Sequence, residues 1–205
     1  MENTLSVFFG NDRSYISILK PTSKGIALTH LDSTSLALGF MDIDDDFRSA
    51  SRELGELLKE TAPMASKIHA VFSIENAFVH QFPASSGASK EELEELLKFE
   101  IRQQMPEYTL EDFHTEAFPM APRLDGTEMM LAISIERNFI LLAEQIFGEL
   151  PIPLARTDVS QLAAHSAIVY NYPEHANGTV MVLGVQENYI DVSVVRQGRL
   201  AYYNL

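Results

Sequence analysis

The sequence has no cysteine and few basic residues, and these two absences exclude several classes of function. Without cysteine, the 205-residue chain can form neither a disulfide nor a thiolate metal site, which suits a reducing compartment such as the cytosol. It holds 15 Lys and Arg against 29 Asp and Glu, a formal net charge of −14. Such an excess, with no compensating basic cluster, repels nucleic acid and anionic lipid. We therefore expect no direct binding to nucleic acid.

A membrane-spanning segment is also missing. The first ten residues, MENTLSVFFG, have neither the basic start nor the long apolar core of a signal peptide. The richest apolar run, 129–135, is far shorter than the roughly 20 residues that cross a bilayer. The six histidines are scattered without a His-x-x-x-His pair, so no metal site is predicted. We expect no direct membrane insertion, and any membrane association should come through a partner.

Residues 89–105, SKEELEELLKFEIRQQM, carry the clearest helix signal. Ser89 and Glu92 predict a capping box, and Pro106 ends the pattern. An apolar stripe follows at helical spacing, made of Leu93, Leu96, Leu97 and Ile101. Glu100 falls inside this stripe. Because a buried carboxylate is costly unless it is hydrogen-bonded, Glu100 should have a dedicated partner, either a neighbouring loop or a ligand.

The rest of the chain alternates between strand and helix patterns. Residues 5–31 predict a three-strand meander, and a helix over 47–61 followed by a strand at 67–74 predicts a βαβ element. Further strands are expected at 78–82, 113–120, 128–135, 154–158, 179–185, 189–196 and 199–204, and further helices at 136–150 and 159–170. Residues 78–150 thus have the order β-α-β-β-α, which predicts a small ferredoxin-like module.

The first and last meanders look like copies of each other. Gly10 can be laid over Gly184, which places the pair Tyr15-Ile16 over Tyr189-Ile190. A glycine at a tight hairpin lets backbone N–H groups come close to a phosphate. The alternative is an ordinary hairpin turn.

Three stretches resemble the PilM family, the actin-like ATPase superfamily proteins of type IV pilus assembly, with relatives in the GspL cytoplasmic domain and in FtsA. They are 82–106 with its KFEIRQQMP ending, RTDVSQLA at 156–163, and the Gly184 hairpin with Gln197-Gly198. The resemblance implies an α/β fold with an actin-like, ribonuclease H-like domain at 1–77 and 151–175. The module at 78–150 would be inserted in it, and 176–205 would open a second actin-like domain. We therefore expect the chain to be a fragment.

The resemblance also implies candidate phosphate-binding residues in the two hairpins. Nucleotide-binding members carry Asp-x-Gly in each hairpin, but the acidic positions here hold Phe8 and Val182. An apolar side chain cannot ligate Mg²⁺, which needs oxygen ligands. We therefore expect a pseudo-ATPase with no catalytic residue and no cofactor, and ATP with Mg²⁺ is the alternative. The candidate cofactor residues are Gly10, Asn11, Ser14, Gly184 and Asn188.

By the same resemblance, the chain is expected to be a non-catalytic cytoplasmic scaffold of a type IV pilus or type II secretion assembly, peripheral to the inner membrane. A groove beside the module would receive the N-terminal peptide of an inner-membrane partner, and an acidic module suits a basic peptide. The candidate contacts are Glu100, Met105, Pro106 and Tyr108. Met105 and Tyr108 could equally be packing residues.

Two alternatives and a second partner stay open. The chain could be an actin-like nucleotide-binding ATPase, or a filament-forming protein similar to FtsA. A hairpin cut from its sheet leaves an unpaired edge that invites pairing with another chain. A homodimer through the edge strands of 179–205 is therefore possible.

Overall fold

The computed structural model describes residues 2–23, 25–37, 45–85, 87–175, 177–185 and 189–204, with the backbone alone at 45–50. The chain divides into two compact units. Unit 1 comprises residues 1–77 and 138–160, and unit 2 comprises 78–137 and 161–205. The division into an inserted module at 78–150 and the start of a second domain at 176–205 stays a prediction.

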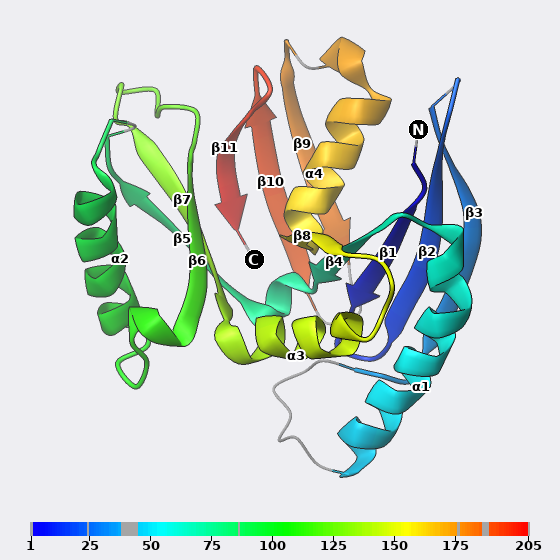
Figure 1. Ribbon diagram of the computed structural model, residues 1–205. Helices are drawn as coiled ribbons and strands as arrows, with labels where there is room; N and C mark the ends of the chain where they lie inside the picture. Colours follow the sequence, from blue (N-terminus) through cyan, green and yellow to red (C-terminus); the bar gives the residue numbers. More distant parts are fainter. Residues whose placement is uncertain are drawn as a thin grey trace. The chain divides into compact units, whose positions relative to one another are not determined.

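Unit 1 is built on a mixed five-stranded sheet of order β3-β2-β1-β4-β8 (Figure 1). The strands are β1 (Thr4–Phe9), β2 (Ser14–Thr22), β3 (Gly25–Thr34), β4 (Lys67–Phe72) and β8 (Leu154–Val159). The first three pair antiparallel, whereas β1, β4 and β8 pair parallel. Parallel neighbours need a crossover, and α1 (Asp45–Thr61) supplies it between β3 and β4. The predicted meander and βαβ element are confirmed.

Strict alternation places the core of unit 1 on one face of this sheet. Leu5, Val7 and Phe9 of β1 are all fully buried. Phe9 stacks on Phe72 of β4, with ring centroids 5.3 Å apart, and contacts Phe147 of α3 (Arg137–Gly148) at 6.0 Å. The outermost strand, β3, is different: its Ile26, Leu28 and Leu31 are 53–62% exposed.

Unit 2 contains the antiparallel sheet β5-β7-β6 and the helix α2 (Lys90–Gln104). Its strands are β5 (Ala77–Pro83), β6 (Phe113–Pro119) and β7 (Met129–Glu136). A buried cluster of Phe82, Leu97, Met130 and Ala132 joins α2 to these strands. The element order β5-α2-β6-β7-α3 matches the order predicted for 78–150, although most of α3 belongs to unit 1.

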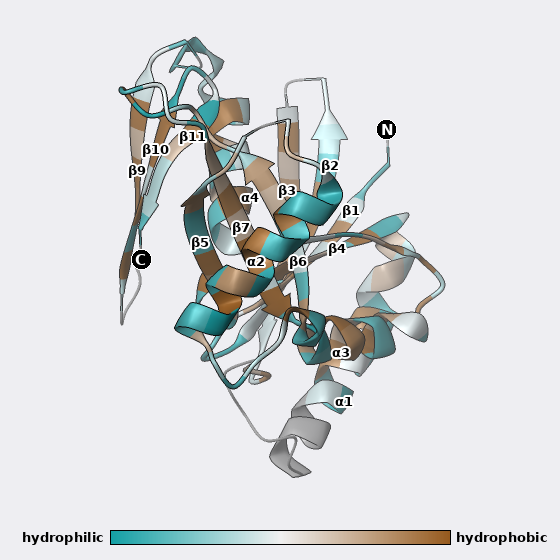
Figure 2. Ribbon diagram, turned by 90° about the vertical axis from the view of Figure 1, so that its left-hand side faces the viewer, coloured by the Kyte–Doolittle hydropathy of each residue, from teal (hydrophilic) through white to brown (hydrophobic). Residues whose placement is uncertain are grey.

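A second three-stranded sheet in unit 2 has the order β11-β10-β9. It comprises β9 (Thr179–Val185), β10 (Ile190–Arg196) and β11 (Arg199–Asn204), all antiparallel. The helix α4 (Ser160–Asn171) lies on one side of it, where Gln161 Nε2 donates to Ser193 Oγ at 3.1 Å (Figures 1 and 2). On the β11 side, the Ala121 N–H donates to the Leu200 carbonyl at 2.7 Å.

Short 3₁₀ helices complete the structure: η1 (Ala62–Met64), η2 (Ile74–Asn76), η3 (Leu110–Asp112) and η4 (Pro173–His175). Within the described ranges, none of the helices combines the length and apolar character that crossing a bilayer requires.

Candidate functional site

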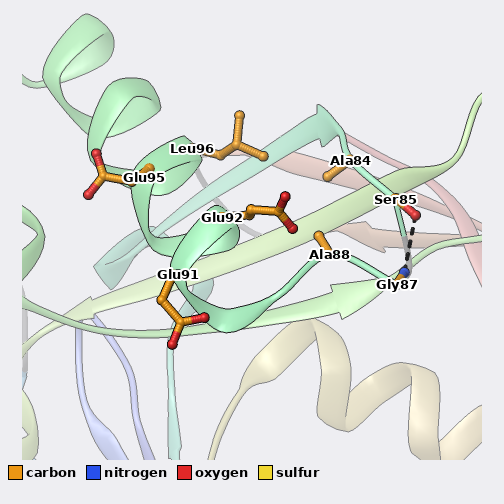
Figure 3. A pocket seen from close by; sticks show the side chains of 8 residues that line it. All are labelled: Ala84, Ser85, Gly87, Ala88, Glu91, Glu92, Glu95 and Leu96. Atoms are coloured by element: carbon orange, nitrogen blue, oxygen red, sulfur yellow. Dashed lines mark hydrogen bonds between the residues drawn. The ribbon is translucent and has the colours of Figure 1, made fainter.

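An open pocket of about 820 Å³ lies at the N-terminal end of α2 (Figure 3). Pockets of this size are typical of ligand-binding sites. One wall comes from the loop that leads into the helix and the other from the first turns of the helix itself. The lining residues are Ala84, Ser85, Gly87, Ala88, Glu91, Glu92, Glu95 and Leu96.

Local hydrogen bonds fix the shape of this pocket. In the loop, Ser85 Oγ accepts from the Gly87 N–H at 3.2 Å, and the Ala88 N–H donates to the Ser85 carbonyl at 3.0 Å. The predicted capping box then starts the helix: Ser89 Oγ accepts from the Glu92 N–H at 3.2 Å, and Glu92 Oε2 accepts from the Ser89 N–H at 2.8 Å. Loop and helix are thus held together at the pocket.

The floor of the pocket is apolar and anchored. Ala84 and Leu96 both line the pocket and pack against the buried cluster of unit 2. Because core packing is dense, side chains attached to it hold their positions. The floor is therefore preformed.

The helix side of the pocket carries three carboxylates, those of Glu91, Glu92 and Glu95. Glu92 points toward the loop, whereas Glu91 and Glu95 point outward from the helix (Figure 3). Glu92 is engaged in the capping box, and Glu95 forms an exposed ion pair with Lys98 at 3.0 Å. Chemically, the pocket can bind a segment that offers apolar and basic groups together. No group of three potential metal ligands occurs within the described part of the chain.

Glu100 has the dedicated partner that its position predicted. Its Oε2 lies 2.7 Å from His80 Nε2, with both side chains 19% exposed. His80 Nδ1 lies 2.8 Å from Gln104 Nε2, and a neutral His80 with its proton on Nε2 satisfies both contacts. The His80 ring stacks against Phe78 and Phe82 of its own strand at 5.9 and 6.0 Å. The pair therefore ties α2 to the strand β5 rather than to a loop.

Met105, Pro106 and Tyr108 follow directly after α2. The Met105 N–H caps the helix on the Ile101 carbonyl at 2.7 Å, and Tyr108 packs on Phe113 with centroids 5.4 Å apart. Pro106 is exposed. With Glu100, these residues occupy the C-terminal end of α2, opposite the pocket on a helix about 22 Å long by its rise per residue. Their role in partner binding stays a prediction.

The first hairpin candidates have structural partners in unit 1. The Gly10 N–H donates to the Arg13 carbonyl at 3.1 Å, and a Cβ on Gly10 would lie 2.6 Å from that oxygen. The Asn11 amide donates to Glu75, and Ser14 Oγ donates to the Leu36 carbonyl at 2.8 Å. Turn geometry alone thus accounts for the glycine.

Gly184 is required for a different reason. It lies inside β9, opposite Asp191 of β10, and a Cβ there would overlap the Asp191 carboxylate. Gly10, in contrast, lies in the turn between the paired residues Phe9 and Ser14. The alignment of Gly10 with Gly184 is therefore wrong, because the two glycines occupy different positions in their hairpins. Asn188 lies outside the described residues, and phosphate binding by either hairpin stays a prediction.

Asp191 is the residue of this region that the sequence did not single out. It is 3% exposed, and burial raises the pKa of its carboxyl group, although the backbone N–H groups of Asp191 and Gly184 act in the opposite direction. Burial and the nearby Asp191 charge also raise the pKa of Tyr203. Among the described residues, neither Asp191 Oδ2 nor the Tyr203 hydroxyl has a hydrogen-bond partner. The only signal in the sequence was an acid within an apolar strand.

No protein-family model and no curated protein matches the sequence. Several solved structures are similar in fold. A chain of the PilM-PilN type IV pilus biogenesis complex superposes with a TM-score of 0.68 and 18% identity, over 98% of this chain and 60% of that one. The cytoplasmic domain of EpsL, an inner membrane component of the type II secretion system of Vibrio cholerae, superposes with a TM-score of 0.61 and 11% identity, over 97% of this chain and 70% of that one.

A Bacteroides thetaiotaomicron protein with an actin-like ATPase fold gives a TM-score of 0.56 and 14% identity, over 98% of this chain and 68% of that one. The chain therefore has the actin-like ATPase fold, as the resemblance predicted, and it is structurally similar to PilM and to the EpsL cytoplasmic domain. It spans 60% of the length of the PilM-PilN chain that it matches. At this level of identity the likeness establishes the fold, and a shared fold does not imply a shared function.

Proposed function

We propose that the chain is a non-catalytic scaffold of a type IV pilus or type II secretion assembly, in which it binds a short segment of an inner-membrane partner. It would work in the cytoplasm, peripheral to the inner membrane through that partner. The observation that carries the proposal is the carboxylate-rimmed pocket of α2. It occurs in a fold shared with a protein from a PilM-PilN complex and with a component of a secretion system.

The chemistry of the pocket selects the kind of segment. Ala84, Ala88 and Leu96 offer an apolar floor, and Glu91 and Glu95 offer negative charge at its rim. A segment with small apolar residues and lysine or arginine complements both features. The chain's net charge of −14 strengthens the attraction at long range.

The contact surface can continue along α2. Phe99, 56% exposed, follows Leu96 and Glu95 by three and four residues, so the three side chains are neighbours on the helix. Exposed aromatic side chains are typical anchors of protein interfaces. We propose that Met105, Pro106 and Tyr108 extend this surface. Glu100 would shape it through His80 rather than supply a free charge.

A peptide titration with two charge-matched variants tests this proposal. The probe is a short fluorescent peptide of alternating lysine and leucine, compared by anisotropy with its glutamate–leucine counterpart. We expect the pocket variant Glu91→Gln/Glu95→Gln to weaken binding of the basic peptide about tenfold, or 1.4 kcal/mol. The control Glu111→Gln/Glu116→Gln removes the same charge from exposed positions of unit 2 outside the pocket and should change it little. Equal losses in both variants would exclude the pocket as the binding site.

The nucleotide-binding alternative rests on the two hairpins. At the positions of the missing acids, Phe8 stacks on Tyr15 with centroids 6.2 Å apart, and Val182 is 9% exposed. We propose that neither hairpin holds Mg-ATP. Calorimetry and thermal unfolding with Mg-ATP should show neither heat nor a shift, because a ligand of the folded state must raise its stability. Saturable binding would favour an actin-like ATPase or a filament former similar to FtsA.

We further propose that the C-terminal strands mediate a homodimer. The edge of β11 is already engaged, because the Leu200 carbonyl accepts from Ala121 and the Tyr203 carbonyl accepts from the Gln81 amide. Edge pairing would therefore have to use β9, the other outer strand of the sheet.

A further inference from the structure

The loop between β6 and β7 carries Leu124, which at 96% exposure is the most exposed large apolar side chain among the described residues. Burying a side chain that is so exposed releases nearly all of the hydrophobic free energy that a leucine can contribute. Arg123, also exposed, precedes it directly. The loop therefore presents an apolar group and a basic group side by side, and these are the two kinds of group that the α2 pocket can bind.

Backbone hydrogen bonds hold the tip of this loop, residues 123–126, in one shape. The Arg123 N–H donates to the Thr127 carbonyl at 2.9 Å, and the Gly126 N–H donates to the Arg123 carbonyl at 3.0 Å. Gly126 has a φ of +88°, which glycine adopts without strain. Because the tip is ordered before it binds anything, it has little conformational entropy left to lose on binding.

Two further contacts fix the base of the loop and its remaining charge. At the base, the Arg196 guanidinium of β10 donates to the Pro122 carbonyl. At the tip, Asp125 Oδ1 accepts from the Thr127 N–H at 2.9 Å. The Asp125 carboxylate is thus engaged within the loop, which leaves Arg123 as the charged group of the tip that is available to a partner.

We propose that the loop tip enters the α2 pocket of a second copy of this chain. The Leu124 side chain lies on the apolar floor of that pocket. The Arg123 guanidinium pairs with the carboxylates of Glu91 and Glu95 on the helix side. The pocket of about 820 Å³ is much larger than one leucine side chain, so it can admit the tip together with its backbone.

The loop and the pocket of one chain lie at the same end of the sheet β5-β7-β6. The Ala84 N–H of the pocket donates to the Glu128 carbonyl, directly before β7, at 3.3 Å, and Figure 1 shows the β6–β7 connection at the end of the sheet where α2 begins. A two-fold axis between two copies can therefore bring each tip to the pocket of the other chain, with two identical contacts. A contact made by two loop tips is smaller than a standard interface, so the dimer belongs to the weak, reversible class.

The loop tip and a partner segment compete for the same pocket. Because both supply an apolar and a basic group to the same floor and carboxylates, only one of them can be bound at a time. The inference thus rests on the proposed function and adds its regulation: self-association occupies the pocket until a partner segment displaces the tip. It is separate from pairing through the edge of β9, because neither the tip nor the pocket includes a residue of that strand.

Sedimentation equilibrium up to the millimolar range tests this dimer by charge reversal. We expect Arg123→Glu to raise the dimer dissociation constant at least about tenfold. The control Arg102→Glu makes the same charge change at an exposed position near the other end of α2 and should alter it little. Glu91→Lys/Glu95→Lys should also weaken the dimer, and adding Arg123→Glu to that variant should restore it, because the two reversed charges attract again. Circular dichroism checks that each variant folds.

The outcomes that overturn the inference are specific. They are a wild type that stays monomeric, a dimer that Arg123→Glu leaves unchanged, an equal loss in Arg102→Glu, and no recovery in the combined variant. The basic lysine–leucine peptide separates this inference from the proposed function. If the peptide binds the pocket of a monomeric wild type, the function stands and the self-contact is refuted. A dimer that depends on Arg123 but resists the peptide would uphold the self-contact and contradict the function.

Discussion

The two hairpin sheets, β1-β2-β3 of unit 1 and β9-β10-β11 of unit 2, have similar alternating sequences but opposite burial. In β1, Val7 and Phe9 are fully buried, whereas in β9 Leu183 and Val185 are more than half exposed. The first sheet continues through β4 and β8, and an aromatic residue of α3 contacts its apolar face. The second has α4 on one side only, as far as the described residues extend. Alternation thus defines a strand, but the surrounding elements decide whether its apolar face is buried.

The buried faces of the two sheets also differ in chemistry. In unit 1 the pairs Leu5–Ile18 and Val7–Ile16 are entirely apolar. In unit 2 the corresponding face holds Asp191, Ser193 and Tyr203, all 5% exposed or less. An apolar face gains free energy from burial, whereas buried polar groups cost free energy unless they are hydrogen-bonded. The second sheet should therefore tolerate changes to its polar residues better than the first tolerates changes to its core.

The largest difference should appear on removing an apolar side chain from each sheet. Phe9→Ala leaves a cavity beside Phe72 and Phe147 and should lower the free energy of unfolding by about 3–5 kcal/mol. Leu183→Ala removes a side chain already more than half exposed and should change it by less than about 0.5 kcal/mol. Denaturant unfolding of both variants, at a concentration where the protein is monomeric, measures this. Similar losses would mean that Leu183 is covered in the folded protein.

The next effect distinguishes the two hairpin glycines. Gly184→Ala should cost about 1–3 kcal/mol, because its Cβ overlaps the Asp191 carboxylate. In an Asp191→Ala background the overlap is gone, so the cost should fall by on the order of 1 kcal/mol. Gly10→Ala places its Cβ against the Arg13 backbone carbonyl, and Asp191→Ala should give no relief there. A double-mutant cycle measured by unfolding gives both coupling energies. Zero coupling at Gly184 would show that the Asp191 carboxylate is not what requires a glycine there.

Most of the fold could be predicted because its signals are local. The capping box of Ser89 and Glu92 and the period of two in β1 depend on neighbouring residues alone. The register of the second hairpin depends on which residue pairs across the strands, and glycine spacing does not determine that. For this reason an alignment based on glycine spacing places Gly10 over Gly184, although Gly10 lies in a turn and Gly184 lies inside a strand.

The candidate site was less predictable, because it depends on contacts between elements that are separate in the sequence. The position of Glu100 in an apolar stripe predicted a partner, but not His80, which lies on another element. The pocket arises where the loop at 84–88 meets the first turns of α2, and each part had an ordinary structural explanation in the sequence. Sites formed between elements need the tertiary structure.

The smallest of these effects concerns the charge buried in the second sheet, at Asp191. Burial raises the pKa of this carboxyl group above its ordinary value, so the folded protein holds the proton more tightly than the unfolded chain. The free energy of unfolding should therefore fall as pH rises from the ordinary aspartate pKa through the folded pKa. Asp191→Asn removes this dependence and should be more stable above the folded pKa, by about 1 kcal/mol, the usual cost of an unsatisfied buried group.

Unfolding experiments across this pH range, with Asp112→Asn as a control of opposite sign, check the assignment. The backbone N–H and hydroxyl of Thr109 donate to Asp112 and lower its pKa. Its contribution to stability is therefore present above the ordinary aspartate pKa and is lost as pH falls through the lowered pKa. Asp112→Asn should thus flatten only the acidic side of the profile, and Asp191→Asn only the side above it. If Asp191→Asn instead destabilised the protein above the folded pKa, the charged carboxylate would have to be a favourable part of the second sheet, and its burial could not be the cost that distinguishes that sheet from the first.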